Sequence, residues 1–517
     1  MNNVRKLSVF LLLSAGVSNL ALAASGCSTD CHTTSSFRND CSTDCGRSSD
    51  CDTDCDTTSD CDRNCSTSFR ARPIVGNLTY RNDLTFFNRY HDARCNFFTW
   101  DSTYIFEKNR HSKCAGAGLF GINNSNTITV AENGGDINSL FLGLGSNTTA
   151  GFSSTITVRP TRRVFSWLSQ MVFNLDSCCT GLWADVSFAV TSVRHRLRLT
   201  EVSTAGTAVT NDIVGGPTNV TDALTRLGVL PGSNSRCKRT GVDDAMIRLG
   251  YDWNYSGNDH VGFYGLGYIP SAKRRRNTSE LFQPTVGTRG GGIGFGMTAD
   301  FTAWSDECNM SDLSIMTELK YTHTLRHRDF RTFDLNNGPL SRFLLVAPQT
   351  NPLAPQPLLP LLTSCVKVQT RHTVDWWLGV HYQFCNFGAE LDYNLYFRDR
   401  ERVCNPNIDF GNLGIFDINA CSDLTTSSTA TVGGAFGSGT TDATFTPLTA
   451  ADVNVRGAGA CRALSSSISG AISYNNVWCD CYPWYLGIGG NVEFASRKHR
   501  RSNFENWGVF GKATISF

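Results

Sequence analysis

Eight cysteines near the N-terminus form four units with the spacing Cys-x-x-x-Cys, which suits either disulfide or metal chemistry. A fully extended unit holds its α-carbons ~13 Å apart, whereas a disulfide needs less than about 7 Å. Each unit must therefore turn or find a partner elsewhere. The units are Cys27/Cys31, Cys41/Cys45, Cys51/Cys55 and Cys61/Cys65, and the last three recur every ten residues.

Residues 1–23 predict a secretory signal peptide. Arg5 and Lys6 precede a short apolar stretch, and Ala21-Leu22-Ala23 offers a small-residue cleavage site. A weak lipobox, Ala24-Ser25-Gly26-Cys27, leaves lipid attachment to Cys27 as an alternative. Export places the 21 cysteines in an oxidising compartment, and the odd number leaves at least one free, lipidated or bonded to another molecule. We therefore expect the Cys-x-x-x-Cys units to form disulfides, within the segment or to other envelope proteins, rather than to bind zinc.

The composition divides the exported chain into two regions. Residues 24–76 are rich in Ser, Thr and Asp and poor in large apolar side chains, so they predict a disordered, cysteine-rich tail. Residues 77–517 alternate aromatic and polar residues and predict one large β domain. The net charge of +1 gives no reason to expect nucleic acid as a partner.

The clearest alternation lies in two segments of the second region. In Asn386–Phe397, Phe387 and Leu391 fall on one face and Glu390 on the other; in Glu505–Phe517, the aromatic and aliphatic residues oppose Lys512. A period of two indicates strands with one apolar and one polar face. Because nothing beyond the signal approaches ~18 to 20 consecutive apolar residues, a membrane span must be a closed sheet.

We expect an all-β fold, a transmembrane antiparallel barrel of about 14 strands, within a range of about 12 to 16. Long connections alternate with short ones, as they do between the outer loops and periplasmic turns of such barrels. A soluble β-sandwich is the alternative, but it would not need apolar faces on nearly every strand. The candidate strands are Phe97–Glu107, Lys113–Ile122, Gly151–Arg159, Arg163–Leu175, Leu182–Val190, Ile247–Tyr255, Val261–Ile269, Ile293–Ala303, Leu313–Tyr321, Val374–Phe384, Asn386–Phe397, Arg462–Tyr474, Trp484–Phe494 and Glu505–Phe517.

Charged side chains recur on the face that would line the lumen. Charge facing hydrocarbon is costly, so this placement indicates a wet or internally ion-paired interior. We expect an open pore whose selectivity these charges tune, and the alternative is a plugged barrel whose charges neutralise one another. The candidate pore-lining residues are Arg248, Asp252, Asp300, Glu318, Lys320, Asp375, His381, Glu390, Asp392, Glu493 and Lys512.

Signatures of catalysis are missing from the sequence. There is no HExxH, GxSxG, P-loop or Cys-x-x-Cys motif, so we predict no catalytic residue, metal or cofactor. His381 beside Asp375 is a weak candidate for an acid/base pair, which leaves an outer-membrane hydrolase as a third hypothesis. Among the loops, a disulfide between Cys404 and Cys421 is a plausible structural staple.

The signal peptide, the alternation of strands and loops, and a terminal strand ending on Phe517 resemble the porins of Gram-negative outer membranes. The cysteine content resembles in style the major outer-membrane porin of chlamydiae. The resemblance implies a bacterial outer-membrane location, contact with lipid and lipopolysaccharide, a homotrimer, and assembly machinery that reads Phe517. It implies passive diffusion of small hydrophilic solutes, with disulfides stabilising or crosslinking the barrel. The alternative is a structural or adhesive envelope protein that uses the barrel as an anchor.

Overall fold

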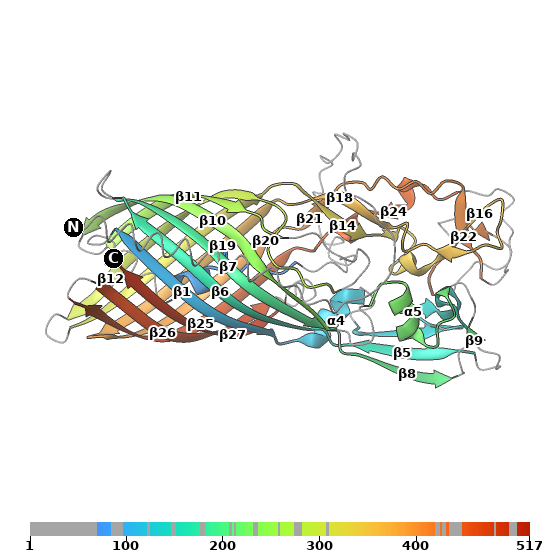
Figure 1. Cartoon of the computed structure of the whole chain (residues 1–517), viewed down its shortest axis with the longest axis horizontal. Coiled ribbons are helices and arrows are strands. Elements are labelled where there is room, and N and C mark those ends of the chain that lie inside the picture. The colour runs from blue at the N-terminus through green and yellow to red at the C-terminus, as the bar shows by residue number, and fades with distance from the viewer. Residues whose placement is uncertain are drawn as a thin grey trace.

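Twelve antiparallel strands of the described residues close into a barrel in the computed structural model (Figure 1). The strand order around the barrel is β1-β27-β26-β25-β20-β19-β13-β12-β11-β10-β7-β6, and β6 returns to β1. The structure describes residues 70–83, 97–120, 125–145, 151–175, 181–205, 209–210, 214–230, 236–256, 259–272, 282–306, 310–418, 424–425, 431–433, 447–479, 482–495 and 504–517.

The barrel strands are long and pair mainly with their neighbours in the sequence. Their bounds are β1 (Phe98–Asn109), β6 (Thr161–Asn174), β7 (Leu182–Arg196), β10 (Arg236–Ser256), β11 (Asp259–Ile269), β12 (Gly292–Asp306), β13 (Ser311–Thr324), β19 (His372–Phe384), β20 (Phe387–Arg398), β25 (Ala463–Trp478), β26 (Tyr482–Ala495) and β27 (Asn506–Ser516). The last strand closes on the first, with Thr99 opposite Ser516. The predicted antiparallel barrel is therefore confirmed, and its strand count lies at the lower end of the predicted range.

Two candidate strands do not belong to the barrel. Lys113–Ile122 was predicted as a strand, but the structure has helix α4 (Ser112–Phe120) there, where small residues replace the alternating large ones. Gly151–Arg159 does contain a strand, β5 (Ser153–Val158), but β5 pairs with β2 (Thr127–Ala131) and β8 (Leu199–Ala205) in a separate sheet. Alternation alone shows a strand with two different faces, not which sheet the strand joins.

The period of two in the sequence becomes an outer and an inner face of the barrel. In β27, Val509 is exposed while Phe510 and Lys512, which lie on the other face of the strand, are buried. In β20, Leu391 is exposed between the buried Glu390 and Asp392. Large apolar side chains therefore cover the outside, as contact with lipid requires.

The barrel has a turn end and a loop end. Both the start of β1 and the end of β27 lie at the turn end, where the backbone of Phe517 bonds to Phe98 at 2.8 and 3.2 Å and the two rings stack. The turn between β19 and β20 has two residues, and the first of them, Cys385, has a positive φ of 50°. The longer connections all emerge at the opposite end, which matches the predicted alternation.

The long connections fold together into a loop domain beyond the barrel, seen to the right in Figure 1. It contains sheets ordered β14-β18-β21, β17-β16-β22-β23 and β3-β2-β5-β8, and the pairs β15-β24 and β4-β9. A large apolar cluster, including Phe333 and Leu344, fills its interior. The remaining elements are β2 (Thr127–Ala131), β3 (Ile137–Asn138), η1 (Ser139–Leu142), β4 (Leu144–Gly145), β8 (Leu199–Ala205), β9 (Val209–Thr210), α5 (Val220–Arg226), β14 (His327–Thr332), β15 (Asp334–Leu335), η3 (Ser341–Phe343), β16 (Leu345–Pro348), β17 (Gln356–Pro357), β18 (Thr363–Thr370), β21 (Glu401–Val403), β22 (Leu413–Phe416), β23 (Leu424–Thr425), η4 (Ala450–Asp452), β24 (Val453–Asn454) and η5 (Arg456–Ala458).

No helix among the described residues is long and apolar enough to cross a membrane.

Cysteines occupy both ends of the barrel. Cys365, Cys404 and Cys461 of the loop domain are disulfide-bonded. Exposed thiols that are not disulfide-bonded stand at Cys385 and Cys479 of the turn end. The predicted partner of Cys404, Cys421, lies outside the described residues, and so do Cys27, Cys31, Cys41, Cys45, Cys51, Cys55, Cys61 and Cys65.

A buried carboxylate, Glu401, joins the loop domain to the top of the barrel. Its two oxygens accept from Arg331 and from Arg70, each at 2.9 Å, and from the Ala460 amide at 3.0 Å. Burial alone would raise the pKa of Glu401, but the guanidinium groups of Arg331 and Arg70 outweigh it and hold that pKa well below its ordinary value. The carboxylate therefore stabilises the fold while it is ionised.

We expect Glu401→Gln to destabilise the loop domain at pH 7 by about 3 kcal/mol, because it leaves buried guanidinium groups without their carboxylate. The stabilisation by Glu401 is fully present above the ordinary pKa of about 4.3 and disappears as the pH falls through the depressed folded value. The difference in free energy of unfolding between the unaltered protein and the variant should therefore stay constant down to about pH 4.3 and shrink below that pH. Unfolding by denaturant, monitored through the protease resistance of the loops, measures this difference.

The matched control is Asp222→Asn, which removes an exposed ion pair with Arg226 on α5. Exposed pairs contribute little, so this variant should stay within about 1 kcal/mol of the unaltered protein. An equal loss from both substitutions would contradict the assigned role of Glu401.

Candidate functional site

Residues 70–83 lie inside the barrel, and we call them the plug. They include part of the segment that the sequence predicts to be a tail, and they end in the helix α2 (Leu78–Asn82). Asn77 caps this helix by accepting the Thr79 amide, at 3.2 Å. The five helical residues and Asp83 are all buried. A helix of this length is not stable by itself in water, so the lumen wall must hold it in place.

The plug extends from the loop end toward the turn end of the lumen. Arg70 contacts Glu401 and Thr370 above the barrel, at 2.9 Å each. Asp83 lies beside Glu390, which is three residues from the start of β20 at the turn end. The expected open lumen is therefore wrong for this structure, and the alternative of a plugged barrel describes it.

The wall receives the plug at positions that the sequence assigns to the lumen. Ten of the eleven candidate pore-lining residues are buried, namely Arg248, Asp252, Asp300, Glu318, Lys320, Asp375, His381, Glu390, Asp392 and Lys512, and Glu493 is half-buried. Contacts with the plug explain the burial of several of them.

A buried ion-pair network holds the middle of the plug. Arg81 of α2 donates to Asp185 of β7 at 3.0 Å, and Arg248 of β10 donates to the same oxygen at 3.2 Å. Arg248 also reaches Glu318 of β13 at 3.1 Å, and Glu318 accepts from Asn82 of the plug at 2.8 Å. All four charged side chains are fully buried. Two arginines and two acids thus alternate, which compensates each charge.

A second network holds the upper plug. Arg72 donates to Asp375 of β19 at 2.5 Å and to Asn394 of β20 at 2.9 Å, and its guanidinium stacks over the Tyr396 ring at 4.5 Å. Lys320 of β13 lies 3.3 Å from Asp375 and donates to the Gly76 carbonyl. The Asp375 carboxylate is therefore paired with one cation from the wall and one cation from the plug.

Further hydrogen bonds connect the plug to other strands of the wall. The Tyr80 hydroxyl donates to the carboxylate of Glu107 of β1 at 2.8 Å, and the side-chain oxygen of Asn491 of β26 lies 3.2 Å from the same hydroxyl. The Ile74 amide donates to Asp243 of β10 at 2.7 Å. Thr79 lies with its hydroxyl 3.4 Å from that of Ser467 on β25. The plug thus touches strands on all sides of the lumen.

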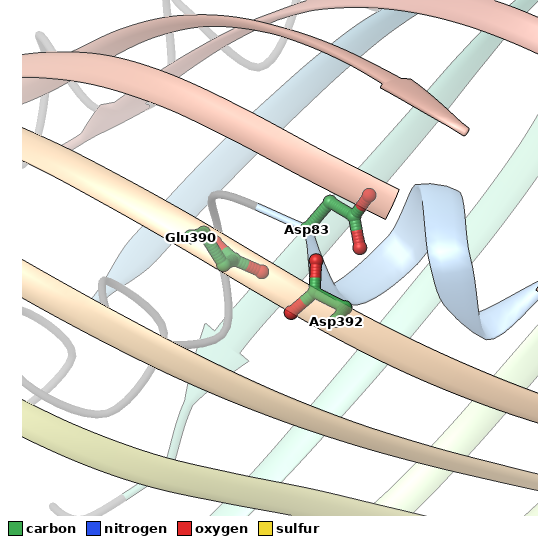
Figure 2. A group of neighbouring side chains, drawn as sticks. All are labelled: Asp83, Glu390 and Asp392. Carbon is green, nitrogen blue, oxygen red and sulfur yellow. The ribbon is translucent and has the colours of Figure 1, made fainter. Parts of the chain in front are cut away.

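Three carboxylates meet at the lower end of the plug (Figure 2). Asp83, at the C-terminus of α2, faces Glu390 and Asp392 of β20, and one oxygen of each lies within 4.8 Å of the others. Lys512 of β27 donates to the carbonyls of Asp83 and, at 3.3 Å, Arg81. Oxygen ligands of this kind suit a hard cation. Close carboxylates repel one another, so protons, Lys512 or a cation must offset their charge.

Apolar contacts supplement the polar ones. Leu78 is fully buried against Met316 of β13 and Trp377 of β19. Tyr80 packs edge-on to Phe510 of β27, with ring centroids 5.7 Å apart. The wall is therefore apolar at the few points where the plug presents apolar side chains.

We expect Leu78→Ala to loosen the plug by about 3 kcal/mol, because it leaves a cavity against Met316 and Trp377. Hydrogen exchange of the plug amides measures this loss directly. The control is Leu391→Ala, which removes the same atoms from the lipid-facing side of β20. That variant should leave exchange in the plug unchanged, and equal acceleration by both would contradict the packing role of Leu78.

The structure does not support the acid/base pair considered from the sequence. Asp375 and His381 lie six residues apart on one strand, which separates them by roughly 20 Å. His381 instead stands opposite Glu390 in the register of β19 and β20. The two residues are therefore not brought together.

Sequence reasoning missed the plug residues Arg72, Tyr80, Arg81 and Asp83. A signal was present, because the predicted lumen face carries seven acids against two lysines and one arginine. Such an excess requires cations from another segment, and Arg70, Arg72 and Arg81 come just before the first strand.

The closed barrel, its apolar outer face and its charged interior together decide the location. The protein is a bacterial outer-membrane β-barrel. No protein-family model and no curated protein matches the chain.

Among solved structures, an outer-membrane channel from Pseudomonas putida F1 aligns with 82% of this chain and 96% of its own, at 8% identity and a TM-score of 0.38. The transport unit of the autotransporter AIDA-I from Escherichia coli aligns with 87% of this chain and 99% of its own, at 8% identity and a TM-score of 0.30. The NanC porin aligns with 68% and 93%, at 10% identity and a TM-score of 0.25. Likeness at this level assigns neither solute nor activity to the barrel.

Proposed function

We propose that the protein is a gated outer-membrane channel for small hydrophilic solutes, in which the plug must shift before a solute passes. The observation that carries this proposal is the buried contact between the plug and a charged lumen wall. The wall keeps Asp185, Glu318 and Asp375 whether or not the plug is present, so a lumen without the plug would fill with water.

The plug is suited to movement because most of its contacts are polar. Water can replace hydrogen bonds and ion pairs at a small net free-energy difference, whereas it cannot replace packed apolar surface. Four apolar side chains of the plug, Ile74, Val75, Leu78 and Tyr80, pack against the wall. Displacement therefore exposes the apolar surface of these four residues, and the polar contacts around them are the ones that water can replace.

Swelling of liposomes in uncharged sugars tests this function. We expect slow swelling with the intact protein, faster swelling with Leu78→Ala, and a decline as the sugar becomes larger. Swelling no faster than in protein-free liposomes for both proteins would contradict a channel. Leu391→Ala again serves as the control and should behave as the intact protein does.

A second candidate, a structural or adhesive envelope protein, is favoured by the loop domain, which has its own apolar core. Non-reducing electrophoresis of native envelopes separates the two candidates. Disulfide-linked species of high mass that collapse with reductant support the structural role, and a monomer under both conditions contradicts it.

A further inference from the structure

A cavity lies between the upper plug and the lumen wall near the loop end. It contains about 590 Å³ not filled by protein atoms, part of it open to solvent. Arg70 and Arg72 of the plug form one side, and Lys320, Thr373 and Arg398 from three neighbouring strands form part of the other.

The cavity is lined by more positive than negative charge. Four cations, Arg70, Arg72, Lys320 and Arg398, face two acids, Asp244 and Asp375. Asp375 is shared between Arg72 and Lys320. Asp244 is held by the amide and hydroxyl of Thr288, at 2.7 and 2.6 Å. Both carboxylates are thus engaged by groups other than Arg398.

Arg398 is the cation with the least compensation. Its guanidinium is buried and donates to two neutral groups, the carbonyls of Arg70 at 2.7 Å and Cys461 at 3.1 Å. Its Nε has no hydrogen-bond partner among the described residues, and the same holds for the Nε of Arg72. The nearby Glu401 is bound to Arg331 and Arg70. A buried cation without a carboxylate is costly unless an anion neutralises it.

We infer that this cavity binds a small anion carrying a carboxylate or phosphate group, with Arg398 and Arg72 as its main recognition residues. Guanidinium groups suit such anions because they donate two parallel hydrogen bonds. The hydroxyls of Thr322, Thr324 and Thr373 line the same cavity and supply further donors. This inference rests on the proposed channel function and names the class of solute that the loop end would capture.

Isothermal titration of the detergent-solubilised full-length protein with inorganic phosphate and with malonate tests the site. We expect saturable binding of at least one of these anions and none of glycerol, which is uncharged. A chain without residues 24–83 should bind neither anion, because the plug supplies one side of the cavity, whereas a chain without residues 24–65 should bind as the intact protein does. Saturable binding of lipopolysaccharide alone would assign the site to a lipid headgroup and would overturn its assignment to a soluble anion.

Two substitutions probe the site independently. Arg398→Gln should weaken binding at least tenfold. Thr373→Glu should do the same without removing a native contact of Arg398, because Thr373 lies opposite Arg398 in the register of β19 and β20 and would place a tethered carboxylate in the cavity. The control is Arg462→Gln, which makes the same charge change at an exposed position near the same end and should alter binding less than twofold.

Absence of saturable binding, or equal binding by all the variants, would overturn the inference. Because the titration needs no transport, anion binding without sugar-driven swelling would refute the channel and keep the site. Swelling without anion binding would support the channel and refute the anion site.

Discussion

Removing residues 24–83 should convert a mostly closed barrel into a steadily conducting one. The deletion takes away every side chain that the described plug contributes to the lumen and leaves a wall of buried, charged residues that water can enter. Planar-bilayer recordings should show continuous current, against infrequent openings for the intact protein. The expected change in mean conductance is therefore at least tenfold.

The same recordings also measure the ion preference of the emptied barrel. Buried acids on the barrel strands outnumber buried arginines and lysines about two to one. Rings of acids favour cations. We therefore expect the emptied barrel to be cation-selective, since Arg70, Arg72 and Arg81 leave with the plug.

The matched control removes residues 24–65 only and keeps the plug. This chain lacks the eight cysteines of the Cys-x-x-x-Cys units but should conduct as rarely as the intact protein. Steady current from the control, or a silent barrel after the longer deletion, would contradict a lumen closed by residues 70–83.

Asp185→Asn should have the largest effect of any single substitution in the lumen. Its carboxylate joins the plug, through Arg81, to the wall, through Arg248. Without it, Arg81 loses its carboxylate, and the remaining acid of the network, Glu318, already accepts from Arg248, from the amide of Asn82 and from the Tyr264 hydroxyl. Removing one partner of a buried pair costs about 3 to 5 kcal/mol. The open population should rise at least a hundredfold, since about 1.4 kcal/mol corresponds to a factor of ten.

A double-mutant cycle with Arg81→Met distinguishes plug anchoring from damage to the wall. If Asp185 acts mainly through Arg81, then Asp185→Asn should change the open probability much less in the Arg81→Met background. A coupling energy above about 1 kcal/mol is expected for groups in contact. Additive effects would show that Asp185 stabilises the wall alone.

The barrel was predictable from sequence because lipid imposes one strict rule. Each strand must present apolar side chains outward at every second position, so segments such as Val374–Phe384 and Asn386–Phe397 carry the pattern locally. The inward placement of Glu318, Asp375 and Glu390 followed from the same rule. Loop strands obey no such rule, which explains why β5 was assigned to the barrel.

The plug was not predictable because its structure depends on distant partners. Arg81 pairs with Asp185, which is 104 positions away in the sequence, and Arg72 pairs with Asp375, which is 303 positions away. Locally the segment has neither a strand period nor a long helical one, and α2 has only five residues. The excess of acids on the predicted wall was the available sign that cations had to come from elsewhere.

A reversible lock on the plug tests the central claim most directly. Thr79 and Ser467 have their hydroxyl oxygens 3.4 Å apart, so Thr79→Cys with Ser467→Cys brings two sulfur atoms within reach of a disulfide. The pair is placed in the Leu78→Ala protein, whose loosened plug provides a measurable current, and peptide mapping verifies the new bond. Thr79→Cys alone is the control.

Bilayer current through the oxidised double-cysteine protein is the decisive quantity. We predict that the current is absent while the disulfide holds the plug against β25, returns when reductant is added, and never depends on reductant in the control. A current that persists with the verified disulfide in place would show that solutes pass without movement of the plug and would contradict the gated channel.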